Sequence, residues 1–416
     1  MSSHLWEKKM MNCIRSINVC FFSFLLLTVF ILDGGTLLAD PTSQALNIPL
    51  RTWTHYLLPT SMANGPAQQG SGVKHMRMFY NSASRQMVLA GGDTNNQYIS
   101  DDGNNMVWSK DLSTVVSTPN WTLLAPWCYN TGQIQPARPD TVGWAYDSKR
   151  NVGVMMPGFY FGTQSSYSNC QSFTGQSPTE TNDSVTFDFS TNTWSAATYP
   201  PPNKGYGGDE GSCFSVYDPV TDSVIRFRDT CCVEVLHRAT NTWSYYSQPY
   251  STNRAQLAID VVGRNVYGIG TVSMHLLRWN IDTHALTDLG RMPASWIGPD
   301  NPTGVEFETY LVFDSVNRVL ISPDPPNHYG QIRGMAFYHV DSGKWDAYEP
   351  VTGKIDGYCV EGNVFGYDPA NNVMIAYGGH GGTCGSPYVY WLYRYGNGSG
   401  SDTTSPSAPK NPRITN

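Results

Sequence analysis

One short pattern recurs six times along this chain: an aromatic or aliphatic residue, an Asn or Asp, a polar turn and an apolar strand. The copies begin at Tyr80-Asn81, Tyr146-Asp147, Tyr217-Asp218, Ile259-Asp260, Phe313-Asp314 and Tyr367-Asp368. After most copies a tryptophan opens a further strand, at Trp121, Trp194, Trp243 and Trp345. Repetition at this spacing is typical of chains that stack similar β units into one body.

The composition agrees with an all-β protein. Among 416 residues, 39 Gly and 27 Pro supply turns, and only 14% of the chain is charged. Long helical patterns are absent from the sequence, and the length leaves ample chain to bury a core.

Each repeat is predicted to form four strands, except the sixth, which has only three. In the first repeat the strands cover residues 76–80, 86–90, 106–110 and 121–125. The segment from Arg51 to Tyr56 carries Trp53, which matches the tryptophans of the fourth strands. If this segment pairs with the last three strands, the ring closes and two exposed sheet edges disappear. We therefore predict a six-bladed β-propeller closed by an N-terminal strand. A pair of β-sandwiches would leave the displaced strand unexplained.

The two ends of the chain have different compositions. Residues 1–39 combine Lys8, Lys9 and Arg15 with a 14-residue apolar stretch, 19–32, which is short for a membrane span. We interpret them as a signal peptide, with an uncleaved signal anchor as the alternative. Residues 40–396 are assigned to the propeller and 397–416 to a flexible linker. The expected protein is a secreted or periplasmic monomer with no membrane span in its mature form.

The charge of the chain limits the classes of molecule that it can be expected to bind. The net charge is −7 and no basic stripe exists, which disfavours nucleic acid and leaves carbohydrate or an extracellular protein. In an exported protein the cysteines should be largely oxidised. Cys128–Cys170 and Cys359–Cys384 are the favoured pairs, and Cys213 can pair with Cys231 or Cys232. No CxxC spacing indicates a cysteine metal site.

Several repeats resemble kelch repeats, the blades of the galactose-oxidase-like propeller superfamily. Gly91-Gly92 and Gly378-Gly379 carry the glycine doublet of such repeats, and the segments ending at Trp194-Ser195 and Trp243-Ser244 match their ending. The middle repeats lack the doublet. The resemblance covers about residues 50–395 and implies the fold, while the superfamily contains both enzymes and binding proteins. The tail resembles the start of a fibronectin type III module, which often accompanies carbohydrate-active domains.

Polar residues cluster in the segments that should line the mouth of the central channel. The candidates for catalysis are His75, Asp209, Glu210, Asp229, Glu361 and His380. The candidates for substrate binding are Arg77, Asp93, Tyr160, Arg254, Glu308 and Tyr329. By contrast, His237 and His339 fall in third strands and are expected to pack in the core.

Several readings of this cluster remain open. Two carboxylates could cleave a glycosidic bond, or a histidine, a tyrosine and Arg254 could act as a polysaccharide lyase. The acidic ring could instead bind a sugar or a divalent cation without chemistry. A copper-radical oxidase is a remote alternative, because no spacing reproduces its ligands. The leading expectation is a secreted propeller that binds a glycan or extracellular partner and that could also cleave glycans. The rival is a non-catalytic module of a larger protein, and no cofactor is required by any motif.

Overall fold

The computed structural model describes residues 48–57, 77–90, 93–96, 99–103, 107–114, 121–126, 143–156, 158–159, 180–181, 185–196, 214–228, 232–250, 252, 255–297, 309–323, 334–346, 349–350, 364–377 and 389–396. The expected signal peptide and the expected linker lie outside these ranges. Within the described part of the chain, no helix has the length and apolar character needed to cross a membrane.

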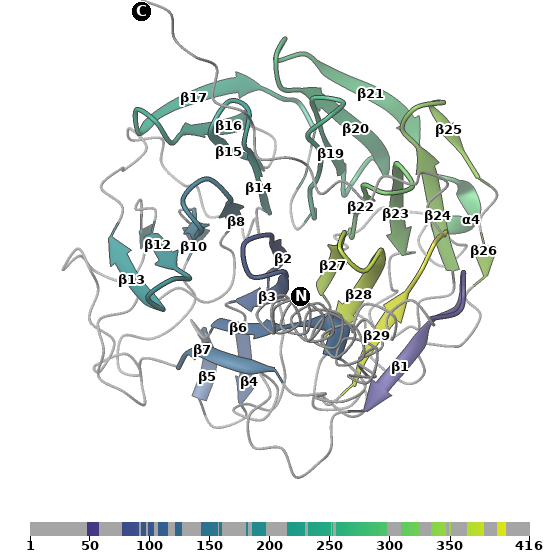
Figure 1. Ribbon diagram of the computed structural model, residues 1–416. Coiled ribbons are helices and arrows are strands. Elements are labelled where there is room, and N and C mark those ends of the chain that lie inside the picture. The colour runs from purple at the N-terminus through teal and green to yellow at the C-terminus, as the bar shows by residue number, and fades with distance from the viewer. Residues whose placement is uncertain are drawn as a thin grey trace, which may run out of the picture.

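Six antiparallel sheets stand in a ring, and each forms a blade of four strands (Figure 1). Blade 1 consists of β2 (Arg77–Asn81), β3 (Gln86–Ala90), β6 (Val107–Lys110) and β7 (Thr122–Ala125). Blade 2 consists of β8 (Trp144–Asp147), β9 (Val152–Met155), β12 (Val185–Asp188) and β13 (Thr193–Ala196). Blade 3 consists of β14 (Ser215–Asp218), β15 (Ser223–Arg228), β16 (Cys232–His237) and β17 (Thr242–Ser247). Blade 4 consists of β18 (Ala258–Asp260), β19 (Asn265–Ile269), β20 (His275–Asn280) and β21 (Leu286–Arg291). Blade 5 consists of β22 (Val312–Asp314), β23 (Val319–Pro323), β24 (Gly334–His339) and β25 (Lys344–Trp345). Blade 6 consists of β27 (Val364–Asp368), β28 (Val373–Tyr377), β29 (Val389–Tyr393) and β1 (Thr54–Leu57). The predicted six-bladed β-propeller is confirmed.

A few short elements lie outside this scheme. β4 (Asp93–Asn96) pairs with β5 (Ile99–Gly103), and β10 (Gly158–Phe159) pairs with β11 (Glu180–Thr181). The 3-10 helix η2 (Leu112–Thr114) and the helix α4 (Ala294–Ile297) each make about one turn. In blade 5 the expected fourth strand is broken, because β26 (Glu349–Pro350) pairs separately with β24.

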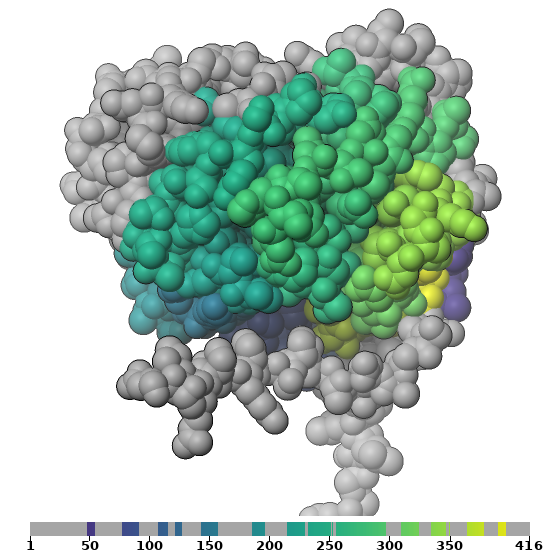
Figure 2. Space-filling view, turned by 90° about the horizontal axis from the view of Figure 1, so that it is seen from above, coloured from purple at the N-terminus to yellow at the C-terminus, as the bar shows by residue number. Residues whose placement is uncertain are grey.

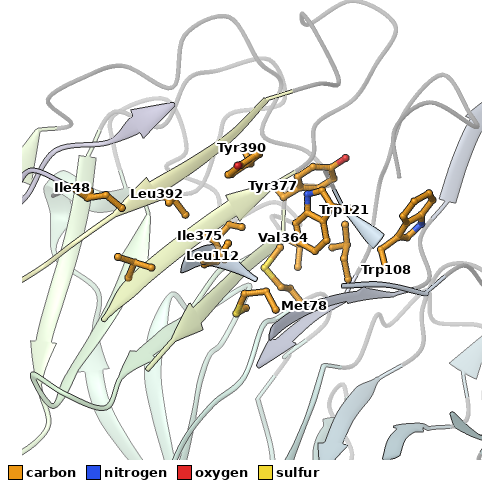
Figure 3. Close-up of a cluster of buried hydrophobic side chains, with 13 residues drawn as sticks. Ile48, Met78, Trp108, Leu112, Trp121, Val364, Ile375, Tyr377, Tyr390 and Leu392 are labelled. Carbon is orange, nitrogen blue, oxygen red and sulfur yellow. The ribbon is translucent and has the colours of Figure 1, made fainter. Parts of the chain in front are cut away.

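The core consists of six clusters of buried apolar side chains, and each cluster joins two neighbouring blades. Successive side chains of a strand point to opposite faces of its sheet. In β3, accordingly, Met87 and Leu89 face blade 6, while Val88 and Ala90 face blade 2. Figure 3 shows the cluster between blades 6 and 1, where the ring of Trp121 meets Tyr377 edge-on at 5.5 Å. Figure 2 shows blades 3, 4 and 5 following one another around the wall of the ring.

The ring closes through the N-terminal strand, as the sequence predicts. β1 pairs antiparallel with β29, from Thr54 opposite Leu392 to Leu57 opposite Val389. Trp53 is 4% exposed and lies 5.1 Å from the Tyr393 ring.

Arg51 fastens this closing strand to blade 5. Its guanidinium lies 4.3 Å from the ring centre of Tyr395 and forms an ion pair with Glu349 of β26. Cation–π contacts of this kind contribute about 0.5–2 kcal/mol. His339 lies beside these residues, and the expectation that it packs in the core is wrong. It is about one third exposed, and its Nε2 lies 2.8 Å from Asp346 Oδ1 and 3.3 Å from the Tyr395 hydroxyl. The third strand of blade 5 ends at His339, so the imidazole meets polar groups at the rim rather than the core.

The recurring Asn or Asp builds the turn between the first two strands of every blade. Its side-chain oxygen accepts backbone N–H groups two or three residues later, for example from Lys149 and Arg150 to Asp147. Such Asx turns stabilise a tight hairpin. Four residues after each Asn or Asp, the backbone is left-handed, with φ of 51–57° at Arg85, Asn151, Asp222, Arg264, Arg318 and Asn372.

Glycine would adopt this left-handed backbone at the lowest cost, yet no copy has it there. The side chains at this position have another role, because several of them tie one blade to the next. Arg264 donates to both carboxylate oxygens of Asp218 at 2.6 and 2.8 Å, and Arg318 does the same to Asp260 at 3.2 and 2.8 Å. The two aspartates are almost fully buried. These ion pairs therefore belong to the packing between blades.

In blades 5 and 6, no arginine of the described residues donates to the turn aspartate. The Asp368 carboxylate of blade 6 accepts hydrogen bonds from the N–H groups of Ala370 and Asn371 and from the Asn371 amide. Burial raises the pKa of Asp368 to about 6, the hydrogen bonds oppose this rise, and the charge of Asp111 adds to it. Arg85 occupies the position of Arg264 and Arg318 in blade 1, but it hydrogen-bonds the Tyr80 hydroxyl instead.

This raised pKa predicts a pH-dependent stability. The folded state holds the Asp368 proton more tightly than the unfolded state, so the stabilisation is complete below about pH 4 and is lost as the pH rises through about 6. In Asp368→Asn this dependence should vanish. Between pH 4 and pH 7 the wild type should lose about 1–3 kcal/mol of unfolding free energy that the variant keeps. Urea unfolding across this range measures it, and a constant difference would show that Asp368 ionises normally.

Candidate functional site

The first strand of each blade starts on one face of the ring, and this face holds the predicted channel mouth. β2, β14, β22 and β27 ring the centre in Figure 1. The starts of neighbouring inner strands are joined there. Ala255 and Thr309 form a parallel bridge, and the N–H of Gln256 donates to the Thr309 carbonyl at 2.8 Å. Side chains at these strand starts therefore approach the ring centre from different blades.

Arg77 and Phe214 meet across the centre. The Arg77 guanidinium carbon lies 3.9 Å from the centre of the Phe214 ring, a close cation–π contact. Arg77 begins β2 of blade 1 and Phe214 directly precedes β14 of blade 3, so the contact bypasses blade 2. Arg77 is only 3% exposed. Its guanidinium is therefore buried against an aromatic ring at the starts of the inner strands. Arg77, Phe214, Ser215 and Gln256, which all lie at or just before these starts, are together called the floor.

A second contact crosses the centre from blade 4 to blade 6. Gln256 Nε2 donates to the backbone carbonyl of Phe365 at 2.6 Å, and the glutamine side chain is buried. The two contacts join non-adjacent blades at the same end of the ring. Together they place side chains across the centre of the mouth.

Two buried polar atoms at this end have no hydrogen-bond partner among the described residues. They are Gln256 Oε1 and Ser215 Oγ, and both side chains are more than nine-tenths buried. Buried polar atoms in proteins are nearly always satisfied by protein, water or ligand. The floor of the mouth thus offers an acceptor and a hydroxyl that a polar ligand or water can complete.

A row of polar residues crosses blade 3 beside the floor. Ser215, Arg226, Glu234 and Tyr245 lie directly opposite one another on the four strands. Arg226 Nε donates to Glu234 Oε2 at 2.6 Å, and Arg228 lies 3.5 Å from the other carboxylate oxygen. Arg226 and Glu234 are at most 2% exposed. Two such charges are stable in the interior only because each faces the other.

Most residues predicted for the site lie outside the described residues. These are His75, Tyr160, Asp209, Glu210, Asp229, Arg254, Glu308, Tyr329, Glu361 and His380. Of the other two, Arg77 lies in the floor, and Asp93 begins β4. Within the described ranges, no three His, Cys, Asp or Glu side chains gather closely enough to hold a metal ion.

Of the seven cysteines considered for disulfides, only Cys232 falls in the described residues. It is disulfide-bonded. The predicted pairings of Cys128, Cys170, Cys213, Cys231, Cys359 and Cys384 therefore stay predictions.

Sequence reasoning missed Phe214, Ser215 and Gln256, because it selected charged residues, histidines and two tyrosines. Their positions at the starts of first strands were the available signal. An uncharged side chain in such a position gives no further sign that it crosses the ring centre.

Comparisons with known proteins identify the fold and no family. No protein-family model matches the chain, and no curated protein matches it in sequence. In structure, 1313 solved chains are similar. One is a protein named YjhT, at 12% identity and a TM-score of 0.50, covering 79% of this chain and 95% of the other. At this identity the likeness shows the propeller architecture alone.

Proposed function

We propose that this protein is a secreted, kelch-like propeller that binds a glycan or another extracellular partner at the mouth of its central channel. The observation that carries the proposal is the floor of the mouth. Two contacts between non-adjacent blades cross the centre, and Gln256 Oε1 and Ser215 Oγ lie there without partners among the described residues. Sugar hydroxyl groups both donate and accept hydrogen bonds, so they can complete both atoms.

The same contacts favour the binding of a ligand at the floor over a catalysed reaction further inside the channel. Arg77, predicted as a substrate ligand, is stacked on Phe214 and is almost fully buried. A ligand therefore rests on the floor instead of passing through the ring. The disulfide at Cys232 supports export, because disulfides persist mainly in oxidising compartments.

A panel of polysaccharides and glycoproteins tests the proposal. We expect the full chain to bind at least one panel member in solution, as measured by calorimetry. Ser215→Ala removes a hydroxyl without breaking a hydrogen bond to the described residues, so its fold should be intact. Its affinity should fall about threefold to tenfold, which is the effect of one lost hydrogen bond.

Val262→Ala is the matched control, because Val262 is 84% exposed in a turn at the other end of the strands. Its affinity should equal that of wild type. Reducing-end and unsaturated-uronate assays on the same panel separate binding from cleavage. If no member binds the correctly folded chain, the glycan proposal is wrong.

A further inference from the structure

A second group of polar side chains lies on the same face as the mouth, toward the outer edge of blade 4. His275 begins β20, Asp288 lies on the neighbouring β21, and Tyr250 follows β17 in the connection to blade 4. The Thr309 hydroxyl donates to the carbonyl of Ile269, which ends β19, and this contact fixes the end of the ring at which the β19–β20 hairpin turns. The group is separate from the floor residues.

The three side chains converge on one carboxylate. His275 Nδ1 lies 2.7 Å from Asp288 Oδ2, and the Tyr250 hydroxyl donates to the same oxygen at 3.1 Å. The N–H of Gly290 donates to Asp288 Oδ1 at 2.8 Å. Asp288 is thus held by three donors from three segments of chain. His275 and Asp288 are each about one third exposed, so solvent reaches the group.

These bonds define the state of the carboxylate and of the imidazole. Partial burial raises the pKa of Asp288, but the hydrogen bonds from His275, Gly290 and Tyr250 outweigh this effect and lower it below its usual value. When His275 is in its neutral form, an ionised Asp288 accepts the proton of Nδ1. The other nitrogen, Nε2, then carries the lone pair, as in carboxylate-oriented histidines generally.

The hairpin that carries His275 is tightly held. Gly270 N–H donates to the His275 carbonyl at 2.9 Å, and Met274 N–H donates to the Gly270 carbonyl at 2.7 Å. Met274 has a left-handed backbone with φ of 55°. The imidazole is therefore fixed at both its backbone and its Nδ1, which is the preorganisation that proton transfer requires.

The other histidines with described side chains are arranged differently. His237 uses both ring nitrogens on Ser223 and Ser244, and His284 stacks on the Tyr246 ring at 4.1 Å. His339 uses Nε2 on Asp346. Only at His275, among these four, does a carboxylate hold Nδ1 while Nε2 makes no hydrogen bond to the described residues.

We propose that His275 is a general base that takes a proton from a hydroxyl group at this second site, with Asp288 and Tyr250 as positioning residues. The proton moves from the hydroxyl oxygen to Nε2, while the Nδ1 proton stays on the bond to Asp288. The carboxylate offsets the positive charge of the imidazolium. With water as the hydroxyl and an ester as the electrophile, the water oxygen bonds to the acyl carbon and the bond from the acyl carbon to the leaving oxygen breaks. The proton on Nε2 then passes to that leaving oxygen, so that the alcohol departs and the imidazole is neutral again.

Chemical modification tests the oriented imidazole without a known substrate. The intact chain is treated with diethyl pyrocarbonate, and each histidine is followed by peptide mass spectrometry. We expect His275 to react several-fold faster than His339, which is equally exposed. In Asp288→Asn its pH–rate profile should fall to lower rates, because the carboxylate no longer orients the ring through Nδ1. Tyr250→Phe should have a smaller effect in the same direction.

Asp282→Asn is the matched control, because Asp282 is an exposed carboxylate of the same blade that pairs with Arg264. It should leave the His275 profile unchanged. The proposal is overturned if His275 reacts no faster than His339, or if Asp288→Asn keeps the wild-type profile.

Ester hydrolysis tests the proton transfer itself, with p-nitrophenyl acetate as the probe. We expect His275→Gln to lower the rate of the full chain about a hundredfold, at the lower end of what general-base catalysis contributes. A solvent isotope effect on the wild-type rate should show that a proton moves in the slow step. Equal rates in wild type and His275→Gln would overturn the proposal. Glycan binding at the mouth is unaffected by either outcome, so the two proposals fail independently.

Discussion

Glu234→Gln is expected to lower the unfolding free energy by about 3–5 kcal/mol, because it removes the negative charge opposite a buried arginine. Glu234 is fully buried in the middle of blade 3, and Arg226 contacts it through Nε and a terminal nitrogen. An amide of the same shape keeps the packing, but it removes the charge and replaces one of the two oxygens that accept from Arg226 and Arg228 with a donor. Urea unfolding followed by tryptophan fluorescence measures the loss.

Two further variants separate the charge effect from general damage to blade 3. The double change Arg226→Met with Glu234→Leu replaces both charges by apolar groups, and it should recover most of the lost stability. Asp282→Ala removes an exposed partner of Arg264 and should cost less than about 1 kcal/mol. If Glu234→Gln is as stable as wild type, the buried pair does not hold blade 3 in this way.

Trp53→Ala should cost about 3–5 kcal/mol and should loosen the closure of the ring. The indole is buried against Tyr393 of blade 6 and Phe365, and it belongs to the cluster between blades 5 and 6. Its loss leaves a cavity beside the only strand that comes from the other end of the chain. Hydrogen exchange should therefore rise first in β1 and in its partner β29.

Val220→Ala is the control for Trp53→Ala, because Val220 is an apolar residue that is 64% exposed. It should change the stability by less than about 0.5 kcal/mol. A small cost for Trp53→Ala, with unchanged exchange in β1, would contradict the role given to the closing strand.

The fold was predictable because its signals are local and repeated. Each Asp or Asn marks a hairpin, and the alternation in strands such as Met87–Ala90 reflects packing against two neighbours. The displaced strand was also predictable, because Trp53 matches the tryptophans of the other fourth strands. The left-handed arginines were not predictable, because Arg264 adopts this backbone in order to reach a partner in another blade.

The candidate site was much less predictable. The contact between Arg77 and Phe214 joins residues 137 positions apart, which only the closed ring brings together. The role of His275 depends on which nitrogen faces Asp288, and composition carries no sign of that. His237 and His339 each end the third strand of a blade, where both are half-buried and bond polar side chains. The expectation that they pack in the core is wrong for both.

We propose that ligands rest on the floor residues at the starts of the inner strands. Hydrogen exchange of the full chain, with and without a glycan that binds it, locates the bound ligand. Protection is expected around Arg77, Ser215 and Gln256. Protection confined to the turns at the other end, around Val262 and Val316, would contradict it.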